Sequence, residues 1–126
     1  PDFAIGRAGW DNWMIYQSLQ QRWPVVDATD ELMIVHQNHD YSHLPDGQAH
    51  YDLEETQINA HLGGGMQNMY MVLDASHEYR HGRVKRARWT LARFFRRLER
   101  LVYSPEQQGP RWALTRRLRL LRKKFV

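Results

Sequence analysis

The sequence of 126 residues contains no cysteine. This absence excludes disulfide frameworks, zinc sites with cysteine ligands, iron–sulfur clusters and catalysis by a thiol. Long apolar runs are absent too: the longest, such as Met69–Leu73, extend over only a few residues. Since roughly 20 apolar residues are needed to cross a bilayer, we expect no transmembrane segment in this chain.

The N-terminal sequence PDFAIGRAGWDNW has no starting methionine and no charged stretch followed by an apolar one. It is therefore not a signal peptide, and we expect a piece of a longer polypeptide. The length fits one compact domain with or without an appendage. With 42% hydrophobic residues, among them 5 Trp, 6 Tyr and 4 Phe, the chain can bury a core.

Acidic residues are scarce in the C-terminal part of the chain. Residues 1–81 carry 3 basic and 12 acidic side chains, net −9, whereas residues 82–126 carry 15 basic and 2 acidic ones, net +13. The formal charge of +4 therefore describes neither part. We predict an ordered acidic part over 1–81 and a basic helical extension over 82–126.

The acidic part shows short segments of both helical and strand character. The pattern predicts helices over about 11–21 and over Leu53–Leu62, the latter stopped by three glycines, and short strands over Pro24–Ala28, Glu31–His36 and Asn68–Asp74. This mixture predicts an α/β layer structure.

The basic part shows apolar residues at helical spacing with arginines between them. Leu91, Phe94, Leu98 and Leu101 predict an amphipathic helix from about Ala87 to Tyr103, and Leu114, Leu118, Leu121 and Phe125 predict a second one after the break at Ser104–Pro110. We therefore expect two basic amphipathic helices at the C-terminus.

A carboxylate beside two indoles is the first candidate site. In Gly9-Trp10-Asp11-Asn12-Trp13, Asp11 stands at the expected start of a helix. One interpretation is that Asp11 caps the helix while the tryptophans pack. The other is that Asp11 faces a cleft as a general base and an indole forms a stacking wall, as in many sugar-binding sites.

Histidines gather in the polar segment Gln37–Asp52 and at its edge. His36, His39 and His43 are spaced closely, with Asn38, Asp40 and Tyr41 between them. Imidazoles bind divalent metals or donate to phosphate oxygens, so the segment is a candidate site. The simpler alternative is a polar loop whose histidines bind backbone groups or water.

His77-Glu78-Tyr79-Arg80-His81 matches the H-E-x-x-H pattern of zinc peptidases. In that motif two imidazoles one helical turn apart hold the zinc ion. Gly82 follows the second histidine directly and few acidic residues remain to supply a third ligand. A surface turn is therefore the simpler interpretation, and a zinc metallopeptidase stays an alternative function.

Three partners could explain the basic extension. Nucleic acid would bind the cations, with Trp89, Phe94 and Phe95 stacking on bases. An anionic membrane surface would bind the same amphipathic helices. In the third interpretation, the two helices pack on the acidic part of the chain. Charge counts do not separate these alternatives.

Across Phe3–His77 the chain resembles the C-terminal half of bacterial nucleotide-sugar glycosyltransferases of the GT-A, family-2-like type. The similarity lies in the ordered strings FAIGRAGWDNWMIY, PVVDAT, MIVHQNHDYSH, GGG and MVLDASH. The resemblance implies a partial GT-A-like layer of short strands and helices. It also implies transfer of a sugar from a nucleotide-diphosphate donor to a glycan or lipid-linked acceptor.

The resemblance assigns roles to individual residues. Asp11 matches the carboxylate that activates the acceptor, and His36 is similar in placement to a histidine that contacts the divalent metal, Mn²⁺ or Mg²⁺, or the diphosphate. The expected substrate-binding residues lie in the same two strings: Arg7, Gly9, Trp10, Asn12, Trp13, Asn38, His39, Tyr41 and His43.

The nucleotide-binding half of such enzymes, with its Asp-x-Asp motif, is missing from these 126 residues. We therefore expect the acceptor-side part of a larger transferase, inactive alone. We further expect a cytoplasmic location, self-association into a homo-oligomer through exposed core surface, and attachment of residues 82–126 to the inner membrane surface. A basic module that binds nucleic acid is the less favoured alternative.

Overall fold

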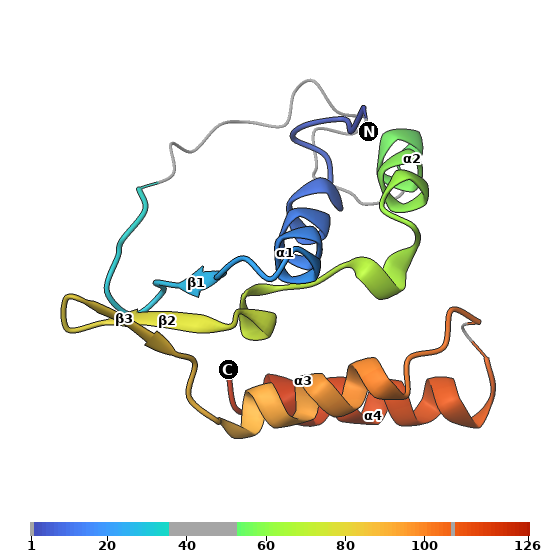
Figure 1. Cartoon of the computed structure of the whole chain (residues 1–126). Helices are drawn as coiled ribbons and strands as arrows, with labels where there is room; N and C mark the ends of the chain where they lie inside the picture. The colour runs from blue at the N-terminus through green and yellow to red at the C-terminus, as the bar shows by residue number, and fades with distance from the viewer. Residues whose placement is uncertain (1, 36–52, 107) are drawn as a thin grey trace.

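The structure is a computed structural model that describes residues 2–35, 53–106 and 108–126. In these residues the chain forms a mixed α/β fold with four α-helices and a small three-stranded sheet. Figure 1 shows α1 (Trp10–Gln20) and α2 (Glu54–Leu62) on one side of the sheet, and the antiparallel pair of α3 (Leu91–Leu101) and α4 (Gly109–Lys123) on the other. The α/β prediction is confirmed at this level.

All four predicted helices are present. α1 follows the turn at Gly9, which has a φ of 108°, a conformation that favours glycine. α3 begins after Thr90, whose hydroxyl accepts a hydrogen bond from the backbone N–H of Arg93 at 3.2 Å. Pro110 lies in the first turn of α4, where its missing N–H costs nothing.

The sheet has the order β1–β2–β3. β1 (Val26–Asp27) pairs in parallel with β2 (His77–Arg80), and β2 pairs antiparallel with β3 (Arg83–Arg86). His81 and Gly82 form the hairpin turn with φ values of 50° and 73°, as a type I′ turn requires. The predicted boundary between residues 81 and 82 falls at this turn, so both predicted parts contribute to one sheet.

Two of the three predicted strands are wrong. Glu31 lies in a turn, and Leu32–Val35 are irregular and exposed, with no strand beside them in the described part of the chain; His36 lies outside it. Asn68–Asp74 forms parts of two 3-10 helices, η2 (Met66–Asn68) and η3 (Val72–Asp74). There the Asn68 amide donates to the Gly63 carbonyl, and the Asp74 carboxylate accepts from the Met71 N–H. These local bonds replace a strand ladder.

Ion pairs hold α3 on the acidic part of the chain. Arg93 pairs with Asp27 of β1 at 3.0 Å, and Arg96 pairs with Asp74 of η3 at 2.9 Å. Arg96 and Asp74 are buried. One of the three interpretations of the basic extension was that its helices pack on the acidic part of the chain. The inner face of α3 packs in this way. Leu91, Phe94 and Leu101 of the same helix are exposed.

Candidate functional site

Asp11 occupies the first turn of α1 and is exposed. Its Oδ1 accepts a hydrogen bond from the backbone N–H of Asn12 at 2.9 Å, so the carboxylate satisfies one free N–H of the helix. Among the described residues no Lys, Arg or His forms an ion pair with Asp11. The carboxylate therefore contributes to capping, and no described residue bonds its second oxygen.

The turn before Asp11 is held by Asn59 of α2, which is fully buried. Its Oδ1 accepts from the Ala4 N–H at 2.8 Å, and its Nδ2 donates to the carbonyls of Ala4 and Ala8 at 3.0 and 3.2 Å. Half-buried Arg7 and Gly9 lie in or beside this turn. A Cβ at Gly9 would lie 3.4 Å from the Cβ of Asn59, so the turn fits closely against α2.

Replacing Asn59 with alanine is expected to lower the free energy of unfolding by about 2–3 kcal/mol, because three backbone groups lose their partner. Chemical denaturation of both proteins measures the difference. Gln57→Ala, at an exposed position of the same helix, is the control and should change stability by less than about 0.5 kcal/mol. Equal effects of the two substitutions would contradict the anchoring role of Asn59.

Asn12 connects α1 to the segment before η3. Its Nδ2 donates to the Tyr70 carbonyl at 2.6 Å, and its own carbonyl accepts from the Tyr70 N–H at 3.2 Å. Asn12 also lines a cavity of about 420 Å³ together with Met69, Arg96 and Arg119. A predicted substrate-binding residue thus lies at the wall of a cavity, directly beside Asp11 in the chain.

The two predicted tryptophans are half-buried. The ring of Trp13 lies 4.8 Å from that of Phe3, measured between centroids. A Cβ at Gly63 would come within 3.2 Å of Trp13 Cδ1. Trp13 therefore packs in the N-terminal part of the fold, as the structural interpretation of the motif predicts.

The remaining predicted site residues lie outside the described residues. These are the substrate-binding candidates and the metal ligand of the histidine-rich segment: His36, Asn38, His39, Tyr41 and His43.

The H-E-x-x-H segment does not form the helix in which this motif of zinc peptidases places its two histidines. His77–Arg80 is strand β2 and His81 lies in the hairpin turn. Glu78 is paired with Arg88 at 2.9 Å. Burial raises the pKa of Glu78, but the hydrogen bonds and charge of Arg88, with the charge of Arg80, outweigh it and hold the pKa below its usual value. A glutamate engaged in this way is not free to activate water.

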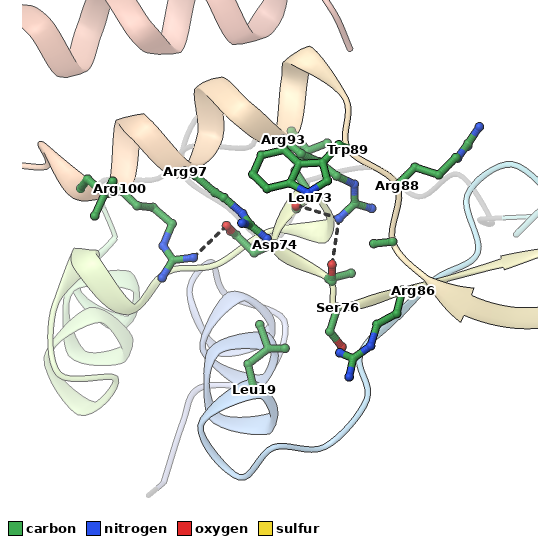
Figure 2. Close-up of a pocket in the computed structure, with 13 residues that line it drawn as sticks. Leu19, Leu73, Asp74, Ser76, Arg86, Arg88, Trp89, Arg93, Arg97 and Arg100 are labelled. Carbon is green, nitrogen blue, oxygen red and sulfur yellow. Dashed lines mark hydrogen bonds and ion pairs between the residues drawn. The ribbon is translucent and has the colours of Figure 1, made fainter.

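A larger cavity of about 720 Å³ lies between α1, the segment from Leu73 to Ser76, and α3. Figure 2 shows its arginines, which come from β3, the following loop and α3, around that segment. They are Arg86, Arg88, Arg93, Arg97 and Arg100.

Three of the five arginines are engaged inside the protein. Arg93 donates to the carbonyls of Leu73 and Ala75 at 2.9 and 2.8 Å. Arg88 pairs with Glu78, and Arg100 with Asp74 at 3.3 Å. Neither Arg86 nor Arg97 forms an ion pair with a described acidic residue.

Sequence patterns alone do not predict this cavity. The spacing of Arg93, Arg97 and Arg100 does place these side chains on neighbouring turns of one helix. This spacing is the sequence feature that could have indicated a cluster of arginines. The packing of α3 across η3 brings Ser76 and Leu19 opposite these arginines. The periodicity of apolar residues in the sequence does not reveal that packing.

Comparison of the chain with families of known proteins, with curated proteins and with solved structures gives no match.

Proposed function

We propose that this chain is the acceptor-side part of a nucleotide-sugar glycosyltransferase. The observation that carries the proposal is Asp11, an exposed carboxylate without an ion-pair partner among the described residues, placed on the first turn of α1. A carboxylate in this state can accept a proton from an acceptor hydroxyl.

Two further features support this role. Asn59 anchors the turn before Asp11, and Asn12, the residue after Asp11, is anchored by its hydrogen bond to the Tyr70 carbonyl. Positioning of a catalytic group from rigid elements is what a general base requires. The half-buried Trp10 lies next to Asp11 in the chain, where an indole suits a sugar ring.

The donor side of the reaction stays a proposal taken from the sequence resemblance, as do the GT-A-like character of the fold and the divalent cation. His36, the proposed metal ligand, lies outside the described residues. Within the described ones no three His, Asp or Glu side chains are grouped so that they could hold a metal ion. The donor nucleotide sugar and the glycan or lipid-linked acceptor are the partners that we propose.

The test is the turnover of nucleotide sugars by the longest native polypeptide that contains this chain. Asp11→Asn is expected to lower the rate of transfer at least roughly a hundredfold, because the amide cannot accept the hydroxyl proton. The side chain keeps its size, so the fold should be preserved.

Asp2→Asn is the matched control, since Asp2 is also exposed and lies outside the proposed site. It should leave turnover within about twofold of the parent. Unchanged turnover in Asp11→Asn, or no turnover of any nucleotide sugar by the parent, would contradict the proposal.

A further inference from the structure

The cavity of about 720 Å³ combines positive charge with an exposed aromatic ring. The guanidinium of Arg97 lies 4.3 Å from the ring centroid of Trp89, a cation–π contact. Both residues line the cavity, and Trp89 is 67% exposed. Arg86 lines the same cavity and is exposed. Two cations that no described carboxylate neutralises therefore share one opening.

The outer surface of α3 beside this opening is apolar. The helix turns Ala92, Arg93, Arg96 and Glu99 inward, whereas Leu91, Phe94 and Leu101 are 55, 43 and 75% exposed. The exposed three share a stripe by their spacing of three and seven residues. Leu101 also lines the cavity, so the stripe reaches the cavity's edge.

We propose that this cavity binds the phosphate group of an anionic phospholipid, with the outer stripe of α3 resting in the headgroup layer of the bilayer. Guanidinium groups bind phosphate oxygens with paired hydrogen bonds. Tryptophan favours the membrane interface, and exposed leucine and phenylalanine side chains beside cations are typical of helices that lie on a membrane.

The apolar stripe favours a membrane over nucleic acid. RNA or DNA would bind the cations and stack on Trp89, but it would leave Leu91 and Leu101 in water. A bilayer covers both the cations and the stripe. This inference concerns binding alone and does not depend on sugar transfer.

The experiment measures binding of the full chain to vesicles by flotation. Binding is expected to vesicles of phosphatidylcholine mixed with phosphatidylserine, and to be at least roughly tenfold weaker to phosphatidylcholine alone. The double variant Arg86→Gln, Arg97→Gln is expected to weaken binding to the mixed vesicles roughly 30-fold. The control, Arg116→Gln, Arg117→Gln, removes the same charge from exposed positions of α4 and should weaken it less than about threefold.

A second pair of variants tests the apolar stripe. Leu101→Ala should weaken vesicle binding roughly fivefold, while Met33→Ala, at an exposed position away from α3, should leave it unchanged. Thermal melts that match the parent would show that these surface variants fold.

Four results would overturn the proposal. The first is the absence of binding to mixed vesicles, and the second is an equal loss of vesicle binding in the two double variants. The third is saturable binding of soluble glycerol phosphate at the cavity with no added affinity for vesicles. The fourth is binding of single-stranded RNA that depends on Arg86 and Arg97, in place of binding to vesicles.

Discussion

Replacing Glu99 with alanine is expected to lower the free energy of unfolding by about 3–5 kcal/mol, the usual cost of removing one partner from a buried ion pair. Its Oε1 accepts from Nε of Arg119 at 2.8 Å, and its Oε2 accepts from Nε of Arg122 at 2.9 Å. Glu99 and Arg122 are both buried. The substitution leaves Arg122 buried without a counter-charge and removes the bonds that join α3 to α4.

Glu106 offers a matched control, because it is the other acidic residue of the basic segment and is exposed. Glu106→Ala removes the same charge and should change stability by less than about 0.5 kcal/mol. Urea denaturation followed by circular dichroism measures both variants. If the two cost the same, the net charge of the segment and not the buried pairing of Glu99 would determine stability.

Replacing Asp74 with asparagine should cost about 3 kcal/mol of unfolding free energy. The Asp74 side chain is almost completely buried and accepts hydrogen bonds from Arg96 at 2.9 Å, Arg100 at 3.3 Å and the Met71 N–H at 3.0 Å. An amide keeps the volume of the carboxyl but loses its charge and replaces one acceptor by a donor. Arg96 and Arg100 would then face an amide whose NH₂ group donates hydrogen bonds and cannot accept one from a guanidinium N–H.

Asp30→Asn is the comparison for Asp74. Asp30 pairs with Arg88 at 3.5 Å, and its side chain is 72% exposed. Exposed pairs contribute at most about 1 kcal/mol, so this variant should remain close to the parent in thermal and urea unfolding. A stability loss in Asp74→Asn no greater than in Asp30→Asn would show that the η3–α3 ion pairs do not hold the two parts together.

These carboxylates explain how the two oppositely charged parts of the chain coexist. Buried apolar side chains are few in the described residues, namely Tyr70, Ala75, Ala92 and Leu118. Arginines of α3 and α4 fill the interior instead, each bonded to a carboxylate or a carbonyl. Removing one partner of a buried ion pair costs more free energy of unfolding than forming the pair contributes. Loss of one buried carboxylate is therefore expected to destabilise the fold more than loss of an exposed charge.

Local patterns predicted the helices well. Leu91, Phe94, Leu98 and Leu101 predicted α3, and α4 was predicted from the same kind of spacing, because helical periodicity depends on neighbours within the chain. Yet the leucine stripe of α3 was not its most buried face. The inward positions include Arg93, Arg96 and Glu99. Carboxylates of other segments lie opposite the two arginines, and arginines of α4 lie opposite Glu99.

Strands were predicted less well because a strand needs a neighbour to pair with. Leu32–Val35 has a strand-like composition, but no neighbouring strand lies beside it in the described residues, and it is exposed. Conversely, the pattern at His77–His81 matched a helical zinc motif. Pairing with β1 and β3 makes His77–Arg80 a strand, so the segment does not have the helical geometry of that motif.

The sequence by itself determined the mixed α/β class, the four helices and the separation of charge. It also placed Asp11 at the start of a helix. Tertiary structure alone decided which arginines are neutralised by carboxylates of the described residues. That choice depends on whether a carboxylate of a distant segment, such as Asp27 or Asp74, lies within a few ångströms of the guanidinium. Charge counts cannot supply that information, because the strength of an ion pair depends on distance and burial.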